Sequence, residues 1–252
     1  MENFITPVEK HNGVWFKRDD KFTIEGIAGG KVRTCFALAK NEKNGLVTAG
    51  SRKSPQINIV AHIGKHLGLP VRAHTPTGEL SPEVLQAQAL GATILQHKYG
   101  YNSVIIKRAR DDAKALGWLE IPFGMETEMA VHETSLQVQN IPNEVKRIVI
   151  PVGSGMSLAG VLHGLIKFNK THIPVLGVTV GADPIKRLDK YAPQGWREMV
   201  TLVSSGIDYH KHASETVLNG VRLDSIYEAK CIPFIEDGDL LWVVGIRRTE
   251  ME

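Results

Sequence analysis

Short apolar runs alternate with helical patterns along most of this 252-residue chain, and this alternation constrains the fold more than any other feature. Strands are predicted at 46–48, 70–74, 92–95, 147–152, 175–180 and 240–244, and helices at 55–67, 82–90, 101–116 and 158–168. The start of the second helix is well marked, because Ser81 supplies a cap and Pro82 opens the first turn. Strands that alternate with helices are typical of a parallel α/β architecture.

The charge balance and the cysteine content exclude several classes of protein. The chain has 30 Lys and Arg residues against 27 Asp and Glu residues, a net charge of +3, and no basic block that would single out a nucleic-acid binder. No apolar run of about 18 residues is present, so no membrane span is predicted. The two cysteines, Cys35 and Cys231, are too few for a disulfide framework. The N-terminus lacks the features of a secretory signal, so we expect a cytoplasmic globular protein that handles a small ligand.

A Gly/Ser-rich turn lies between a predicted strand and a predicted helix at residues 153–160, Gly-Ser-Gly-Met-Ser-Leu-Ala-Gly. Backbone N–H groups in such a turn can approach an anion closely, and the helix dipole adds partial positive charge. No Lys follows the second glycine, so this is not a Walker loop, and the three spaced glycines of the dinucleotide fingerprint are missing. The glycines alone are equally compatible with a plain strand–helix turn.

Two further segments place cations at predicted helix starts. Lys31 follows Gly29 and Gly30, and partial desolvation there would lower its pKa and expose a nucleophilic amine, although a plain surface lysine is the alternative. In the segment 51–56, Ser54 caps a helix that Pro55 opens, while two cations crowd the same end. Cations are unfavourable at a helix N-terminus, so an anionic ligand is expected here, with two solvated loop charges as the alternative.

Five motifs together resemble the fold type II pyridoxal-phosphate enzymes, the tryptophan synthase β superfamily. They are most similar to the branch that contains 1-aminocyclopropane-1-carboxylate deaminase and D-cysteine desulfhydrase. In chain order the motifs are Phe16–Asp20, Gly29–Arg33, Ser51–Lys53, Gly153–Gly160 and Asp224–Lys230. Each motif is weak alone, but five in the family's order span nearly the whole chain.

The resemblance implies a fold and an assembly. We expect two three-layer α/β domains with mainly parallel sheets and the cofactor, pyridoxal 5′-phosphate, in the cleft between them. Residues 1–36 and 122–252 would form the large cofactor-binding domain, and residues 37–121 a small inserted domain. Relatives of this fold commonly form dimers, so a homodimer is expected.

The resemblance also implies roles for particular residues. Lys31 would hold the cofactor as a Schiff base and move the Cα proton, and Glu228 would face the pyridine nitrogen. Tyr227 would be a second acid or base, with ring packing as the alternative. The cofactor phosphate would be bound by Gly153, Ser154, Gly155, Met156 and Ser157, and the substrate by Ser51, Lys53, Ser54 and Gln56, with Ser51 also in a catalytic role.

Two departures from the family pattern concern asparagines. The Asn that precedes the family's lysine is Gly30 here, and the Asn that bonds the cofactor ring hydroxyl is replaced by Arg52, which is expected at that cofactor-binding position. Arg52 and Lys53 together point to a substrate with an extra negative charge. The metal spacing of His62 and His66 has no third ligand, so no metal site is predicted.

Three functional hypotheses follow. The first is a pyridoxal-phosphate-dependent lyase or deaminase that acts at Cα or Cβ of a small amino acid. The second keeps the cofactor but takes a larger anionic or nucleic-acid-linked amine as substrate. The third is a non-catalytic cofactor- or anion-binding protein of the same fold. Tyr191 and Trp196, two aromatic residues of the polar stretch 183–220, are interpreted as packing residues, with a place in the substrate pocket as the alternative.

Overall fold

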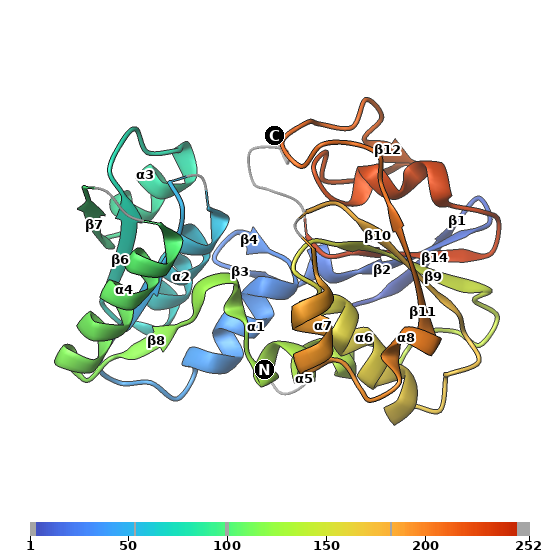
Figure 1. Ribbon diagram of the computed structural model, residues 1–252, viewed down its shortest axis with the longest axis horizontal. Coiled ribbons are helices and arrows are strands. Elements are labelled where there is room, and N and C mark those ends of the chain that lie inside the picture. The colour runs from blue at the N-terminus through green and yellow to red at the C-terminus, as the bar shows by residue number, and fades with distance from the viewer. Residues whose placement is uncertain (1–3, 53, 99–100, 182, 246–252) are drawn as a thin grey trace. The chain divides into compact units, whose positions relative to one another are not determined.

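The described chain divides into two units in the computed structural model, which covers residues 4–52, 54–98, 101–181 and 183–245 (Figure 1). The first unit comprises Met1–Phe22, Ala28–Gly30 and Glu128–Glu252, and the second comprises Thr23–Ile27 and Lys31–Thr127. The second unit therefore extends at both ends beyond the segment 37–121 that the sequence predicts as an inserted domain.

A six-stranded sheet forms the centre of the first unit. Its order is β1 (Val8–His11), β2 (Val14–Arg18), β14 (Asp239–Val243), β9 (Arg147–Val152), β10 (Val175–Thr179) and β11 (Val200–Ser204). β1 is antiparallel to β2, and the other neighbouring pairs are parallel. Parallel strands are buried on both faces, which is why β9 and β14 read as near-continuous apolar runs.

Successive side chains of these strands enter two separate apolar clusters. Ile148 and Ile150 face the helices α5 (Glu128–Leu136), α6 (Met156–Lys167), α7 (Ile185–Tyr191) and α8 (Trp196–Met199), whereas Val149 faces the opposite side. That side is covered by the 3-10 segment η3 (Glu228–Phe234) and the hairpin of β12 (Val217–Leu218) and β13 (Val221–Arg222). The result is a three-layer unit, with α5–α8 on one side of the sheet in Figure 1.

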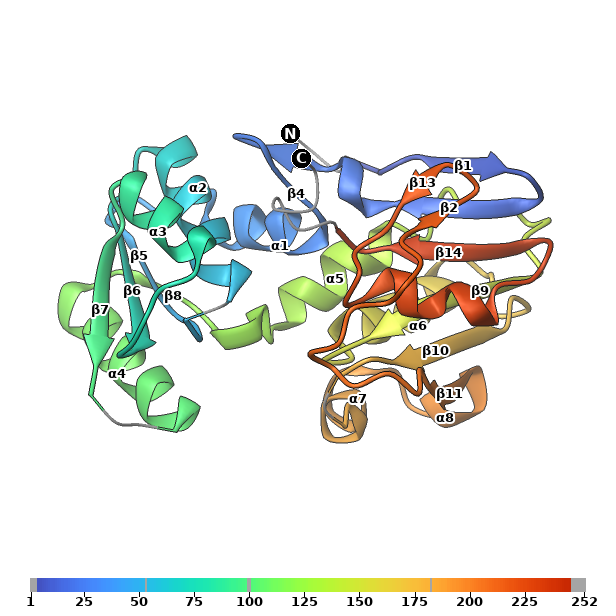
Figure 2. The same cartoon turned by 90° about the horizontal axis from the view of Figure 1, so that it is seen from above.

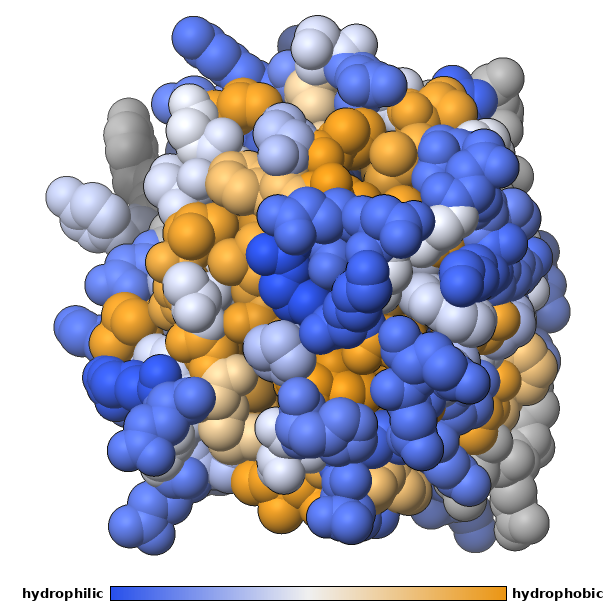
Figure 3. Space-filling view, turned by 90° about the vertical axis from the view of Figure 1, so that its right-hand side faces the viewer, coloured by the Kyte–Doolittle hydropathy of each residue, from blue (hydrophilic) through white to orange (hydrophobic). Residues whose placement is uncertain are grey.

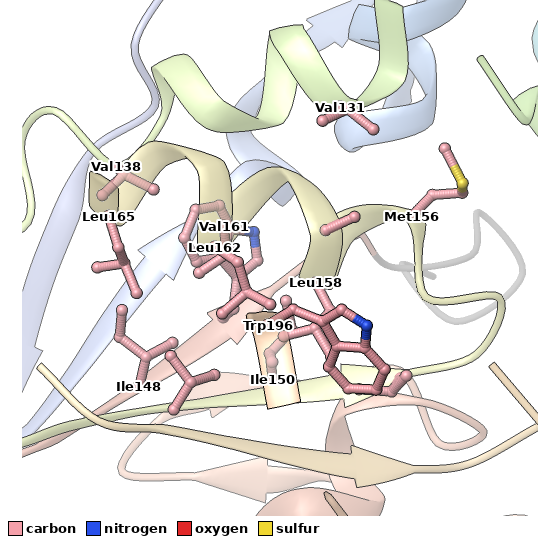
Figure 4. Close-up of a cluster of buried hydrophobic side chains, with 14 of the residues drawn as sticks. Val131, Val138, Ile148, Ile150, Met156, Leu158, Val161, Leu162, Leu165 and Trp196 are labelled. Atoms are coloured by element: carbon pink, nitrogen blue, oxygen red, sulfur yellow. The ribbon is translucent and has the colours of Figure 1, made fainter. Parts of the chain in front are cut away.

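Two aromatic residues of the polar stretch 183–220 complete the helical side of this core. Trp196 is 5% exposed and Tyr191 is 7% exposed, and both belong to the cluster of Ile150 and Leu158 (Figure 4). The interpretation of these two residues as packing residues is therefore confirmed.

The second unit is built on a four-stranded parallel sheet. Its order is β7 (Thr93–His97), β6 (Val71–Pro76), β5 (Leu46–Ala49) and β8 (Leu119–Ile121). Helix α4 (Asn102–Leu116) packs on one face through Ile105 and Ala109, and α2 (Pro55–Leu67) and α3 (Pro82–Ala89) lie on the other face (Figure 2). The remaining elements are α1 (Gly30–Ala39), the hairpin of β3 (Thr23–Ile24) and β4 (Ile27–Ala28), and the 3-10 turns η1 (Asp19–Lys21) and η2 (Phe123–Met125).

The predicted α/β class with mainly parallel sheets is confirmed, and local signals place most element ends well. Helix α2 has the predicted bounds, because Ser54 accepts a hydrogen bond from the Gln56 amide and Gly68 ends the helix with φ 69°. Helix α6 begins at Met156, two residues before the predicted 158, because Gly155 takes a left-handed conformation as its cap. Within the described ranges, no helix is long and apolar enough to cross a bilayer.

The surface does not by itself indicate a partner. Figure 3 shows one face on which hydrophobic and hydrophilic residues are interspersed. The large exposed hydrophobic side chains come from many different elements: Phe4, Leu85, Tyr101, Val104, Leu116, Ile166, Tyr209 and Val217. The homodimer therefore stays a prediction.

Candidate functional site

The Gly/Ser-rich turn of the first unit connects the end of β9 with the first turn of α6, as the sequence predicts. Gly155 caps the 12-residue helix with φ 91°, a conformation that favours glycine. The Ser154 and Ser157 side chains are half-buried. Met156 points its side chain into the core, so only its backbone N–H can face a ligand. The turn thus offers two hydroxyls and the unpaired amides of a helix N-terminus to an anion.

Tyr227 lies directly against the first residue of this turn. A Cβ added to Gly153 would lie 2.9 Å from Tyr227 Cε1 and 3.5 Å from its hydroxyl oxygen. Any side chain at Gly153 would therefore displace the ring. The Tyr227 hydroxyl is also 3.1 Å from the hydroxyl of Tyr209, and the two rings meet edge to face. The structure thus brings two phenol groups together beside the predicted phosphate-binding turn.

Tyr209 is a residue that sequence reasoning missed, because it lies in the polar stretch to which no structure was assigned. Its backbone is held by Lys230, a fully buried residue whose Nζ donates to the carbonyl oxygens of Asp208 (2.8 Å) and Tyr209 (3.3 Å). Further along, the Ala213 amide donates to the Ser225 carbonyl over 2.8 Å. The only signal in the sequence was an aromatic residue in a loop ahead of the Asp224–Lys230 motif.

Glu228 is fully buried as the first residue of η3. Its Oε1 accepts hydrogen bonds from the amides of Val244 (2.8 Å) and Gly245 (3.2 Å). Its Oε2 is equally buried and has no hydrogen-bond partner among the described residues. Burial, followed by the nearby Asp224 charge, raises the pKa of the Glu228 carboxyl well above its ordinary value. One oxygen of this carboxyl is therefore held rigidly while the other awaits a donor.

Lys31 follows a glycine pair that is attached to the same segment. The Gly30 amide donates to the Val244 carbonyl over 2.9 Å. A Cβ on Gly29, whose φ is 113°, would lie only 2.9 Å from that carbonyl oxygen. Lys31 is then the second residue of α1, and it is exposed. The Gly29–Gly30 pair and Glu228 are thus joined through Val244, and the chain enters α1 one residue before Lys31.

The predicted substrate loop opens α2 in the second unit. The Ser54 hydroxyl accepts a hydrogen bond from the Gln56 amide over 3.2 Å, and Ser51 accepts one from the Ser54 amide through its carbonyl oxygen. Arg52 is exposed, and its guanidinium lies against Gly78, where a side chain would collide with it. Lys53 lies outside the described residues.

Gln56 is not available to a substrate. Its buried amide nitrogen donates to Thr48 Oγ1 (2.9 Å) and to the Pro122 carbonyl (2.8 Å). Its Oε1 accepts a hydrogen bond from the Gly124 amide (2.7 Å). These bonds tie α2 to β5 and to the segment after β8, so we no longer include Gln56 among the substrate-binding residues.

These features of the first unit fit pyridoxal phosphate. The turn before α6 suits a phosphate group. The unpartnered Glu228 Oε2 suits a protonated ring nitrogen, because a buried carboxyl oxygen is costly without a donor. Had the buried carboxyl been saturated by protein donors, as ordinary buried acids are, this cofactor would not fit.

The comparisons with known proteins point in the same direction. The family model described as pyridoxal-phosphate dependent enzyme matches residues 3–230. The chain is 27% identical over 198 residues to a Salmonella phage ViI protein named O-seryl-dTMP PLP-dependent decarboxylase. That match covers 66% of this chain but only 46% of the phage protein, so the chain spans less than half the length of this relative.

Solved structures share the fold at low sequence identity. A structure of an ACC deaminase homologue superposes with a TM-score of 0.78 and 22% identity, covering 96% of this chain and 89% of the other. Threonine deaminase isoform 2 from Solanum lycopersicum follows at 0.67 and 15%, covering 98% and 81%. Serine racemase from Dictyostelium discoideum gives 0.67 and 14%, covering 96% and 92%. At these identities the likeness shows the fold alone.

Proposed function

This chain belongs to the family of pyridoxal-phosphate dependent enzymes, and we propose that it acts as a lyase or deaminase on an amino acid, with Lys31 as the residue that carries the cofactor. Its cofactor is pyridoxal 5′-phosphate, which supplies an electron sink for the electron pair of the bond that breaks at Cα. The protein selects that bond by the way its own residues hold the substrate and move protons.

Three groups of predicted residues receive tasks in this proposal. The amides of Gly153–Met156 and the hydroxyls of Ser154 and Ser157 hold the phosphate group. Lys31 would hold the cofactor through its amine, and the same amine would accept or return the Cα proton. In the second unit, we assign the substrate carboxylate to the Ser51 and Ser54 hydroxyls at the start of α2.

The buried, unpartnered Glu228 Oε2 is the observation that carries the proposal. A carboxylate at the ring nitrogen favours the protonated ring, because the two charges attract strongly in a site without water. A protonated ring withdraws electrons more strongly than a neutral one, and this favours reactions that pass through a carbanion at Cα. The positive ring would in turn lower the pKa that burial raises in Glu228.

Tyr227 and Tyr209 are the proposed second acid–base group. Their hydroxyls are 3.1 Å apart, so one phenol can donate a hydrogen bond and the other phenol oxygen can accept it. Tyr227 also contacts Gly153, which keeps its hydroxyl next to the proposed phosphate-binding turn.

The test is a visible absorption spectrum of the purified protein with pyridoxal phosphate, followed by borohydride trapping and mass mapping. We expect a yellow species in the wild type and in Lys40→Ala, a control at an exposed lysine just after α1, and none in Lys31→Ala. An adduct mapped to a different lysine, or a spectrum unchanged by Lys31→Ala, would refute the proposal.

A second candidate is decarboxylation of an amino acid that is linked to a nucleotide. It is favoured by the name of the phage relative and by Arg52, an exposed cation at the helix start where the resemblance predicts an asparagine. Loss of carbon dioxide from O-seryl-dTMP, with no ammonia released from free serine, would support it. Arg52→Asn should then weaken use of the nucleotide-linked substrate by about tenfold, as expected for a lost charge-assisted contact.

A further inference from the structure

The second unit contains a network of hydrogen-bonded polar side chains that the proposed cofactor chemistry does not use. Arg108 Nη1 lies 2.6 Å from His97 Nδ1, and His97 Nε2 lies 2.9 Å from His74 Nδ1. His74 Nε2 in turn lies 3.0 Å from Asp112 Oδ2. Arg72 closes the network with two bonds to the Asp112 carboxylate, of 2.7 and 3.2 Å. This network thus joins β6, β7 and α4, and it leads from the exposed Arg108 through His97 to the buried His74.

The hydrogen bonds of this network can be assigned one consistent set of donors and acceptors. A guanidinium can only donate, so His97 Nδ1 accepts from Arg108 and His97 Nε2 carries the proton. His74 Nδ1 then accepts a hydrogen bond from His97 Nε2–H, and His74 Nε2–H donates to the Asp112 carboxylate. Both imidazoles are neutral in this arrangement. A proton added at His97 Nδ1 would be stabilised by Asp112 through His74, which is 4% exposed.

The side chains of this network carry more positive than negative charge. Asp112 is the carboxylate of the cluster, and Arg72 already pairs with it. Arg108 forms no ion pair among the described residues, whereas its helical neighbours Lys107 and Arg110 pair with Asp111 and Glu120 respectively. Two guanidinium groups against one carboxylate therefore leave a net positive charge at the exposed end.

The exposed end lies at the carboxyl edge of the four-stranded sheet, on its outermost strand β7. His97 is the last residue of β7, so it sits at the carboxyl edge of a parallel sheet. His97 is half-buried and Arg108 is exposed, so both can be reached from solvent. Lys98, also exposed, follows directly and adds a further positive charge.

We propose that His97 and Arg108 form a binding site for a phosphate group on the second unit, with His74 and Asp112 positioning His97. An incoming phosphate takes the place of the Arg108–His97 contact. The arginine fork and a protonated His97 Nδ1 then both donate to phosphate oxygens, which are strong charge-assisted bonds. The phosphate can belong to a free nucleotide or to a nucleic-acid backbone. The site stands on the second unit's own contacts and does not depend on the proposed reaction.

Binding should take up a proton. Burial, followed by the neighbouring His74 ring and the charge of Arg108, lowers the pKa of His97 in the free protein, and Asp112 opposes this only in part. Arg72 is paired with Asp112, and Lys98 adds positive charge at the residue that follows His97. A bound phosphate adds negative charge beside the ring, so the pKa of His97 rises and affinity falls as the pH increases through that value.

The experiment is a titration of the cofactor-loaded protein, in which the phosphate-binding turn of the first unit is already filled. The His97 ring protons are followed by NMR while inorganic phosphate, dTMP or a short oligothymidylate is added. We expect a saturable shift of His97 and a raised His97 pKa with phosphate. Arg108→Gln should weaken the binding by about tenfold, and Arg110→Gln, a matched control paired with Glu120, should leave it unchanged.

The outcomes test whether the site exists and show which kind of molecule supplies the phosphate group. Similar affinity for phosphate and dTMP assigns a site for a single phosphate group, and much tighter binding of the oligonucleotide assigns a polynucleotide backbone. No saturable shift of His97, or an equal loss in Arg110→Gln, overturns the site. Arg108 and Arg110 are both exposed, so neither variant should prevent folding.

Discussion

Two carboxylates, one in each unit, are treated by their surroundings in opposite ways. Asp112 accepts two hydrogen bonds from Arg72 and lies within hydrogen-bond distance of His74, and these partners hold its pKa below the ordinary value even though burial opposes this. Glu228 is completely buried, and two backbone amides reach only one of its oxygens. Its pKa is raised well above the ordinary value.

The difference separates a carboxylate whose hydrogen bonds complete a structure from one that has a buried oxygen without a described donor. The partners of Asp112 come from β6, so the side chain fastens α4 to the sheet. No described residue supplies a donor to Glu228 Oε2, and proteins rarely leave such an atom buried without a functional reason. Replacing Glu228 should therefore change mainly the activity, and replacing Asp112 should change mainly the stability.

Glu228→Gln should have the largest effect, and mainly on activity. A neutral amide cannot stabilise a protonated ring nitrogen, so turnover should fall by at least about 100-fold. The measurement is steady-state kinetics of the cofactor-loaded variant, with Asp112→Asn as the comparison that should retain turnover. Full activity in Glu228→Gln would remove Glu228 from the proposed mechanism.

The same variant should raise the stability of the cofactor-free protein at neutral pH. Because the folded-state pKa of Glu228 is raised, the folded wild type holds a proton that the unfolded chain releases above about pH 4.3. Stability is thus lost as the pH rises from there toward the folded-state pKa, and glutamine has no such loss. Urea unfolding at several pH values measures the two slopes, and parallel slopes would contradict the burial of an unpartnered carboxyl.

Asp112→Asn should act on stability instead. The variant leaves Arg72 without its counter-charge and weakens the bond to His74, so we expect a loss of about 2 kcal/mol in the free energy of unfolding at neutral pH. The lowered pKa means that this contribution is present above the ordinary Asp pKa and disappears as the pH falls through the folded-state value. Asp111→Asn, at an exposed pair with Lys107, is the control and should cost less than about 0.5 kcal/mol.

Arg72→Lys should produce the smallest change. A lysine keeps the charge but replaces the two-pronged contact with Asp112 by a single one, which should cost about 0.5–1 kcal/mol. Urea unfolding of Arg110→Lys, whose Glu120 contact is exposed, provides the baseline. A larger loss in the baseline variant would show that the Asp112 contact has no special weight.

The elements of the fold could be predicted from neighbouring residues. Alternation of apolar runs with helical patterns predicted the parallel α/β class, and Ser54 with Pro55 predicted the start of α2 to the residue. The Gly/Ser-rich turn was found because a strand, two glycines and a helix start follow one another within a few positions. The cofactor was predicted from the order of five motifs, and the family match confirms it.

The partners of individual side chains could not be predicted in this way. Gln56 looked like a substrate-binding residue by its position in the loop, but its amide is bonded to Thr48, Pro122 and Gly124. Tyr209 carried no motif, and it gains importance only because Lys230 and Tyr227 hold it.

Sequence by itself therefore determined the type of most elements, the place of the Gly/Ser-rich turn and the kind of cofactor. Tertiary structure decided which polar atoms are satisfied: Glu228 depends on amides 16 and 17 residues away, and His74 on Asp112, 38 residues away. The physical reason is range. Backbone propensities and caps act between residues a few positions apart, whereas burial and hydrogen-bond partners arise only when distant segments pack together.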